Sequence, residues 1–291
     1  VQMKSKGFLS LILVLCIQLA IFGRSDKVRP YLKKQDEVAV KTQHQNSSSS
    51  SSSVPHVKIL WMYWEQGLEH LESLAREGDP KYSSDYNCVK AWQLLNPDWD
   101  IRVLDRKQAT QLSSKFAAIM KNDRNHYLTP QKASNVLRLE LLTKFGGVWS
   151  DTSNCPFQPL NDFVPQMLAT STGGFFMPFL GGEKYSGNLN GVELKEKWSD
   201  CHKLRPDDRM YDADGARSAN NWFLVAAQPH NIVFETWLNA LFERMIWITM
   251  NHHHGFFPYY IAQCTFTQVR IQHPVVEQAW QVFQQQPHYL F

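Results

Sequence analysis

The stretch KFGGVWSDTSN, Lys144 to Asn154, contains the sharpest change of character in this sequence. An apolar, helix-like run ends at Phe145, two glycines follow, and the short apolar piece Val148–Ser150 leads directly into Asp151. Glycines commonly end helices, and short apolar runs bounded by turn residues are typical of buried strands. The sequence therefore predicts a helix, a tight turn and a strand that delivers a lone carboxylate into a polar turn.

The segments before this stretch alternate between strand and helix. Strands are predicted at Val57–Trp64 and Ile101–Asp105. Helices are predicted within Asp85–Trp99, where the helical spacing stops at Asn96-Pro97, from Lys107 to about Met120 and from Pro130 to the glycines. This alternation predicts an α/β body with a largely parallel sheet. Ligands of such sheets bind beyond the carboxyl ends of the strands, where Asp151 is expected. Further on, Ser218–Trp247 is interpreted as two helices separated by Pro229–Asn231.

Composition limits the class of protein. With 291 residues, 43% of them hydrophobic and 20% charged, the chain fits one sizeable domain plus appendages. A net charge of +3 without a basic stripe argues against nucleic acid as a partner. The 10 Trp, 10 Tyr and 17 Phe residues are expected mainly in the core.

The first 56 residues predict a membrane tether. Residues 1–6 form a short basic tail, residues 7–23 are uncharged and just long enough to span a bilayer, and residues 24–56 form a polar, serine-rich stem. An uncleaved signal-anchor is favoured over a cleaved signal peptide, because no convincing cleavage site follows the apolar run. The basic tail predicts a single-pass type II orientation. The domain at 57–291 would then be lumenal, in the Golgi or another secretory membrane, with a glycosylation sequon at Asn46.

Four cysteines lie in the body, and they allow up to two disulfides in three possible pairings: Cys88, Cys155, Cys201 and Cys264. Their spacing matches no zinc pattern.

A candidate site follows from Arg138 and Asp151. Asn135 and Arg138 share one face of the predicted helix, and Gly146 and Gly147 allow a tight turn back toward the strand. An arginine fork and a carboxylate in one crevice suit a ligand with phosphates and hydroxyls. An Arg–Asp pair that merely connects helix and strand is the competing interpretation.

The segment ASNVLRLELLTKFGGVWSDTSNCPFQPL, Ala133 to Leu160, resembles glycosyltransferases with a DXD-type sugar-binding region, in particular the capsular-polysaccharide-synthesis-like family. KILWMYWEQG, NPDWDIRVLD and NNWFLVAAQPHNIVFETW resemble flanking parts of that family, so the likeness runs from about Val57 to near Trp280. The resemblance implies a glycosyltransferase A-type fold, a nucleotide-sugar donor, a glycan or glycoconjugate acceptor, retention of anomeric configuration and usually a divalent metal such as Mn2+.

The resemblance also implies roles for individual residues. Arg138 matches the arginine that contacts the donor, and Asp151 matches the first acid of the DXD motif, which binds sugar or ribose hydroxyls and helps to hold the metal. These two are the expected catalytic residues, with Asp151 as the metal ligand. The residues expected to bind the donor are Trp61, Asn135, Arg138, Gly146, Gly147, Asp151 and Ser153.

Two departures from the family pattern bear on activity and metal binding. Asn135 stands where the family usually has Asp, and Ser153 replaces the second acid of the motif. Because hard cations prefer anionic oxygen ligands, metal dependence stays open. A catalytically inactive nucleotide-sugar-binding relative and a membrane-tethered lectin-like protein are the alternatives to an enzyme.

Other polar residues are weaker candidates. Asp212 and Asp214 form a literal D-x-D in a polar loop, where a turn is the expected role. One residue of His252–His254 could supply a remote ligand. Further along, Asn221 and Trp222 could line the acceptor side, although core packing is expected for the tryptophan. Asp105 and Glu140 are expected to be structural charges.

Overall fold

The computed structural model describes residues 57–123, 128–169, 171, 173–180, 218–251 and 261–284. The chain divides into two units, Val1–Ser53 and Val54–Phe291, and every described residue belongs to the second. The predicted tail, anchor and stem fall on residues 1–56, outside the described ones. In the part that the structure covers, no helix combines the length and the apolar character that a bilayer crossing requires.

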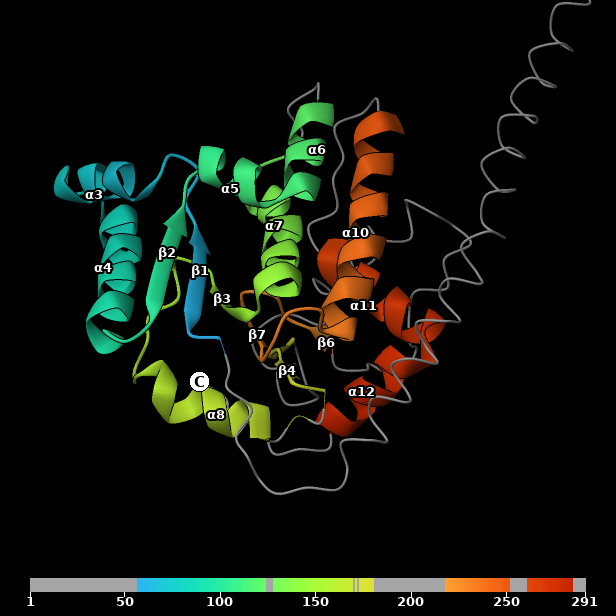
Figure 1. Cartoon of the computed structure of the whole chain (residues 1–291). Coiled ribbons are helices and arrows are strands. Elements are labelled where there is room, and N and C mark those ends of the chain that lie inside the picture. Colours follow the sequence, from blue (N-terminus) through green and yellow to red (C-terminus); the bar gives the residue numbers. More distant parts are fainter. Residues whose placement is uncertain are drawn as a thin grey trace, which may run out of the picture. The chain divides into compact units, whose positions relative to one another are not determined.

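A five-stranded mixed sheet forms the centre of the domain, in the order β2-β1-β3-β7-β4 (Figure 1). Its strands are β1 (Ile59–Tyr63), β2 (Asp100–Leu104), β3 (Gly147–Ser150), β4 (Phe175–Phe176) and β7 (Phe223–Ala226). β1 pairs in parallel with β2 and β3, whereas β7 pairs antiparallel with β3 and β4. A separate two-stranded sheet consists of β5 (Phe179–Leu180) and β6 (Ser218–Ala219). The α/β class and the parallel arrangement of the first three strands are confirmed.

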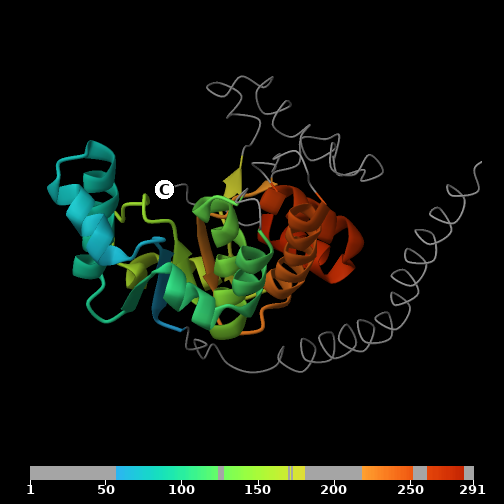
Figure 2. The same cartoon turned by 90° about the horizontal axis from the view of Figure 1, so that it is seen from above.

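Helices cover both faces of the sheet (Figures 1 and 2). They are α3 (Leu68–Arg76), α4 (Pro80–Leu95), α5 (Arg106–Leu112), α6 (Ser114–Asn122), α7 (Pro130–Phe145), α8 (Leu160–Ala169), α10 (Ile232–Asn251), α11 (Ile261–Gln272) and α12 (Pro274–Gln284). Aromatic contacts identify the two faces. Tyr63 of β1 packs on Phe116 of α6, while the next residue, Trp64, packs on Tyr82 of α4. Because successive strand residues point to opposite faces, α6 and α7 lie on one face and α4 on the other.

α7 carries the sequence signals that delimit it. The Thr129 side chain caps its amino terminus by accepting from the Lys132 amide, and Pro130 occupies the first turn, where a missing N–H costs nothing. The helix ends at Gly146, whose φ of 69° is accessible to glycine at little cost. From there β3 begins at once, so the predicted helix, glycine turn and strand are confirmed.

Two element predictions were wrong. The first half of Ser218–Trp247 is not a helix, because Phe223–Ala226 forms β7 and Ser218–Ala219 forms β6. Its short apolar run fits a buried strand as well as a helix, and pairing with β3 and β4 decides for the strand. The helix expected from Lys107 to Met120 is interrupted at Ser113, which ends α5 and whose side chain caps α6.

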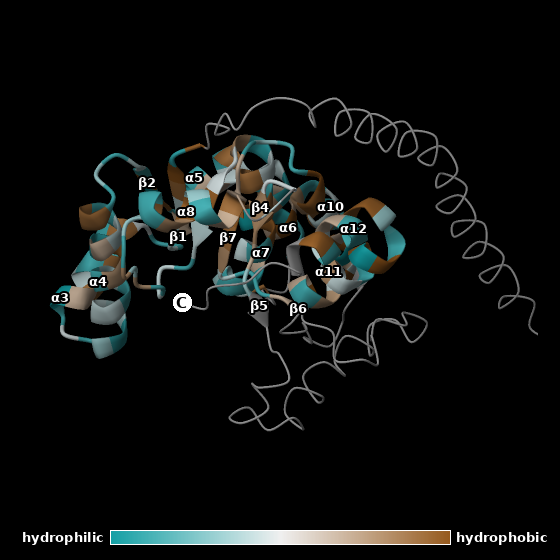
Figure 3. Ribbon diagram, turned by 90° about the horizontal axis from the view of Figure 1, so that it is seen from below, coloured by the Kyte–Doolittle hydropathy of each residue, from teal (hydrophilic) through white to brown (hydrophobic). Residues whose placement is uncertain are grey.

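The core explains the high aromatic content. Its largest fully buried side chains include Trp61, Trp149, Trp237 and Trp280. In Figure 3 hydrophobic residues (brown) run along β7 and the helices beside it, and hydrophilic residues occupy the outer turns. These rings serve packing, as the sequence suggested.

Candidate functional site

Asp151 is the first residue beyond the carboxyl end of β3. Its amide donates to the Trp222 carbonyl at 2.9 Å, which continues the pairing of β3 with β7 by one residue. The Asp151 side chain is 35% exposed, although every residue of β3 is buried. The strand therefore delivers one accessible carboxylate to the edge of the sheet where ligands of α/β proteins bind.

Arg138 of α7 fixes the direction of that carboxylate. Its Nη2 lies 3.2 Å from Asp151 Oδ1, and the Trp149 indole donates to the same oxygen at 2.9 Å. The guanidinium also lies over the Trp149 ring, 4.9 Å from the centroid, so cation–π attraction adds to the ion pair. The structure thus brings together the two residues on which the predicted site depends.

Arg138 itself is enclosed, with 4% of its side chain exposed. Its Nε and Nη2 donate to the backbone carbonyl and hydroxyl of Ser134, and its Nη1 donates to the Asn221 carbonyl. Three of the five N–H groups of the guanidinium therefore donate hydrogen bonds among the described residues, and the contact with Asp151 is an ion pair. Burial lowers the pKa of the guanidinium, and the charge of Asp151 partly offsets this. Arg138 thus holds Asp151 from a buried position, and its burial limits direct contact with a ligand in this conformation.

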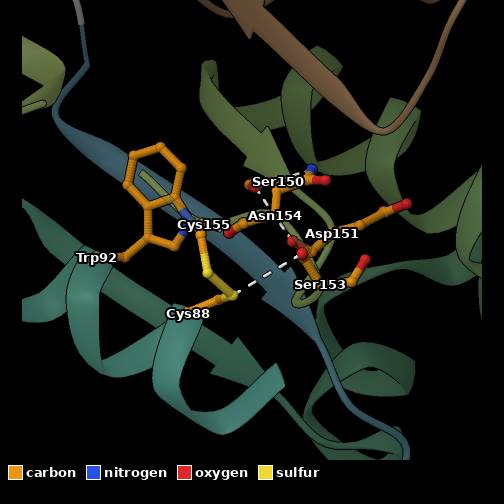
Figure 4. Close-up of a disulfide and its surroundings, with 7 residues drawn as sticks. All are labelled: Cys88, Trp92, Ser150, Asp151, Ser153, Asn154 and Cys155. Carbon is orange, nitrogen blue, oxygen red and sulfur yellow. Dashed lines mark hydrogen bonds between the residues drawn. A yellow bond between two sulfur atoms is a disulfide. The ribbon is translucent and has the colours of Figure 1, made fainter. Parts of the chain in front are cut away.

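The turn after Asp151 is fastened to α4 by a disulfide between Cys88 and Cys155, with Cα atoms 4.4 Å apart (Figure 4). The Trp92 indole donates to the Asn154 backbone carbonyl at 2.8 Å, and the Asn154 side-chain Nδ2 donates to the Trp222 carbonyl at 2.9 Å. In Figure 4 the Asp151 side chain points away from the disulfide. One of the three pairings left open by the sequence is thereby identified, and Cys264 is disulfide-bonded as well.

Buried amides lie beside Arg138. The Asn221 side chain donates to Asn135 Oδ1 at 2.7 Å, and Gln263 of α11 donates to Asn221 Oδ1 at 3.4 Å. Asn135 therefore has a structural partner in this conformation, and Asn221 lies against α7 through both its carbonyl and its side chain. Gln263 had no signal in the sequence, because its partner lies 42 residues away.

Trp61 and the glycine pair lie away from the carboxylate. Trp61 is fully buried, and its indole donates to the Gly146 carbonyl at 3.0 Å, so it supports the turn and exposes no ring to a nucleotide. Gly147 starts β3 and Asp151 follows its end, which separates them by about 13 Å at the usual rise per strand residue. The expected donor contacts of Trp61, Gly146 and Gly147 are not available in this geometry, whereas Ser153 is exposed on the turn.

The carboxyl end of β1 contributes two unusual polar atoms. β1 pairs in parallel with β3, so Tyr63 ends β1 at the same edge of the sheet at which Asp151 follows β3. Tyr63 Oη and Trp64 Nε1 are buried and have no hydrogen-bond partner among the described residues. Burial, reinforced by the negative charge of Glu65, raises the pKa of Tyr63, so its hydroxyl remains a proton donor. Since buried unpaired donors are rare in native proteins, this strand end is a place where a ligand could complete the hydrogen bonding.

Two charges that looked structural in the sequence are structural. Asp105 caps α5 in a capping box with Gln108, and Glu140, 2% exposed, accepts from the amides of Ser114 and Lys115 at the start of α6 and pairs with Lys144. Asp212, Asp214 and His252–His254 lie outside the described residues.

The described residues contain few ligands for a divalent metal. No group of three His, Cys, Asp or Glu residues in these ranges converges on a metal position. Asp151 Oδ1 accepts from the Trp149 indole and pairs with the Arg138 guanidinium, which leaves Oδ2 as its available oxygen. Since Mg2+ and Ca2+ take six or more oxygen ligands, most ligands of a cation here would have to come from the phosphates of a donor. Metal binding stays a prediction, with Asp151 as its protein ligand.

Comparisons with known proteins identify the family of the chain. Curated proteins yield no match. Among solved structures the chain is similar to the "PaToxG Glycosyltransferase", with 14% identity, 88% of this chain and 86% of that chain covered, and a TM-score of 0.36. That likeness is too distant to assign a fold or a reaction. The family model for "Capsular polysaccharide synthesis protein" matches residues 17–177, more than half of the chain, and includes Arg138 and Asp151. The chain therefore belongs to the capsular polysaccharide synthesis protein family, which confirms the family resemblance and the glycosyltransferase class expected from the sequence.

Proposed function

We propose that the protein transfers a sugar from a nucleotide-sugar donor to a glycan or glycoconjugate acceptor, with retention of the anomeric configuration. The observation that carries the proposal is the accessible Asp151 carboxylate, which Arg138 and Trp149 hold at the carboxyl edge of β3. A fixed carboxylate oxygen accepts hydrogen bonds from sugar or ribose hydroxyls, which are the groups that a nucleotide-sugar presents.

The reaction breaks the bond between the anomeric carbon and the diphosphate oxygen and forms a bond to an acceptor oxygen, whose proton passes to the departing diphosphate. Positive charge develops on the sugar ring and negative charge on the departing diphosphate. Asp151 Oδ2 orients the donor by its hydroxyls, and fixed orientation lowers the entropic part of the barrier. We propose a front-face transfer in which the acceptor attacks on the side of the leaving group, a route that needs no protein nucleophile.

We also propose that the domain works in an oxidising compartment, as a lumenal, membrane-tethered enzyme of the Golgi or another secretory membrane. The Cys88–Cys155 disulfide supports this, since disulfides persist mainly in such compartments. The apolar residues 7–23 and the basic side chains before them are the basis for the tether.

The test is a screen of UDP- and GDP-sugars, with and without Mn2+, in which nucleotide release and sugar transfer are measured for the wild type and for Asp151→Asn. Loss of a charged hydrogen bond costs about 1.5–3 kcal/mol, so we expect kcat/KM to fall by about 10- to 100-fold. Asp162→Asn, which changes an exposed acid on α8, is the matched control and should transfer sugar at the wild-type rate.

Three outcomes would decide against the proposal. A folded Asp151→Asn protein with wild-type turnover would refute the proposed site. Donor binding by the wild type without release or transfer would favour the inactive relative. Glycan binding indifferent to nucleotide would favour the lectin-like alternative.

A further inference from the structure

Two elements hold the acid loop, Asp151–Cys155: the strand end before β7 and the helix α4. On the side of β7, the Trp222 carbonyl accepts from the Asp151 amide and from the Asn154 side chain, each at 2.9 Å. On the side of α4, the loop is fastened by the Cys88–Cys155 disulfide and by the bond from Trp92 to the Asn154 carbonyl. The loop therefore bridges α4 and β7.

The α4 fastening is anchored in rigid surroundings. Cys88 and Trp92 are one helical turn apart on the same face of α4 and are almost fully buried. The Trp92 ring stacks on Phe223 of β7, with centroids 6.4 Å apart. Cys88 Sγ lies 3.8 Å from the Ser153 carbonyl oxygen, so the cross-link touches the middle of the loop as well as its end (Figure 4). A shift of the loop toward or away from α4 would break these contacts together.

Within the loop itself, the Asn154 backbone amide donates to the Asp151 carbonyl at 3.1 Å, while Thr152 and Ser153 lie outside any regular pairing. Asp151–Cys155 contains no helix or strand, and Ser153 and Cys155 are exposed. Arg138 and Trp149 fix one oxygen of Asp151, but they do not hold the backbone of the following three residues. Loops whose backbone lacks regular pairing open at low free-energy cost.

We propose that the Cys88–Cys155 disulfide and Trp92 are positioning residues of the site, which hold the acid loop at the distance from α4 at which Asp151 can meet the donor. They touch neither donor nor acceptor and act through the loop. The role of the loop in donor binding rests on the proposed function, whereas the immobilisation of the loop does not.

The first measurement is hydrogen exchange of the Asp151 amide in the full chain, for the wild type and for the double variant Cys88→Ser/Cys155→Ser. We expect protection of this amide to fall at least 10-fold more than protection of the β1 amides. Leu241→Ala, a fully buried position on α10, is the matched control for lost global stability and should lower both sets of amides equally. Equal loss at Asp151 and β1 in the double variant would overturn the proposal.

The second measurement is the KM for whichever UDP- or GDP-sugar the wild type uses. We expect the double variant to raise KM by 3- to 10-fold, and Leu241→Ala to leave KM unchanged. If the double variant folds poorly, Trp92→Phe keeps the ring on Phe223, removes the bond to Asn154 and should raise KM in the same direction by a smaller factor. An unchanged KM in both variants, with an active wild type, would refute the positioning role alone. A wild type that uses no donor would refute the proposed function, and the exchange result would still decide whether the disulfide holds the loop.

Discussion

Replacing Gly147 by alanine separates a structural role of the glycine pair from a role in donor binding. Gly147 has a φ of +93°, and a Cβ at this position would lie 2.5 Å from the Ile59 carbonyl oxygen of the neighbouring strand β1. Gly78 has a φ of +86° and nothing within 4 Å of a built Cβ. The pair of variants Gly147→Ala and Gly78→Ala therefore shares the backbone cost and differs in the steric contact.

The expected magnitudes follow from these two terms. A left-handed φ costs an alanine about 1–2 kcal/mol, and a less flexible unfolded chain returns about 0.4–1 kcal/mol, so Gly78→Ala should lose about 1 kcal/mol. The contact with Ile59 adds about 1–3 kcal/mol, as overpacking typically does, so Gly147→Ala should lose about 2–4 kcal/mol. At about 2–4 °C per kcal/mol for a domain of this size, the melting temperature should fall by roughly 5–15 °C for Gly147→Ala and by about 2–4 °C for Gly78→Ala.

Thermal and urea unfolding measure the stability difference, and donor KM is measured well below the melting temperature of both variants. We expect KM to stay at the wild-type value in Gly147→Ala, because β3 runs between this residue and Asp151. Equal stability of the two variants would show that β1 and β3 are not packed at Ile59 as described. A raised KM in Gly147→Ala at full folding would restore the glycine pair to the donor site.

Two further substitutions test roles assigned to buried residues. Trp61→Phe removes the indole hydrogen bond to the Gly146 carbonyl and leaves unfilled volume in the core. Urea unfolding should therefore show a free energy of unfolding lower by about 2–3 kcal/mol, with the donor KM unchanged. A raised KM at unchanged stability would instead support contact of Trp61 with the nucleotide. For Glu140, burial opposes ionisation, but hydrogen bonds from Lys144 and Ser113 and the charge of Lys144 outweigh it and lower the pKa of the carboxyl below its ordinary 4.5. The ionised Glu140 carboxylate therefore contributes its full stabilisation above pH 4.5, and this stabilisation is lost as the pH falls through the lowered pKa. Glu140→Gln should lower the free energy of unfolding by about 2–4 kcal/mol at pH 7, and the variant should lose less stability than the wild type as the pH is lowered. A loss of stability at low pH identical to that of the wild type would contradict the assignment.

The parts of the fold that were predictable are those in which local and global signals coincide. Pro130 and Gly146 delimit α7 through backbone preferences that hold in any context, and the direct step from Gly147 into β3 follows from them. β7 was not predictable in the same way. Its four residues Phe223–Ala226 are apolar on both faces, so they lack the alternation that distinguishes strand from helix, and only pairing with β3 and β4 makes them a strand.

The same division applies to the candidate site. Arg138 and Asp151 were predictable because both are charged residues in a strongly patterned stretch, whereas no role was predicted for Ser134, which accepts two hydrogen bonds from Arg138. The contacts made by the backbone carbonyls of Asn221 and Trp222 could not be predicted. Every residue has a carbonyl, and only the fold determines which one a guanidinium or an amide contacts. The loss of Trp61 from the site has a similar cause. A tryptophan in a strand can face ligand or core, and Gly146 provides the core partner.

Charge balance gives Asn135 a physical meaning. Arg138 is buried and Asp151 neutralises it, whereas the Asn135–Asn221 amide pair beside them adds hydrogen bonds and no charge. A second carboxylate at position 135 would bring an additional negative charge next to a single buried arginine, where desolvation makes unpaired charge expensive. The neutral pair, however, does not balance the diphosphate of an incoming donor. That compensation has to come from a divalent cation or from basic side chains beyond this cluster, which is why addition of Mn2+ is the most informative variable in the donor screen.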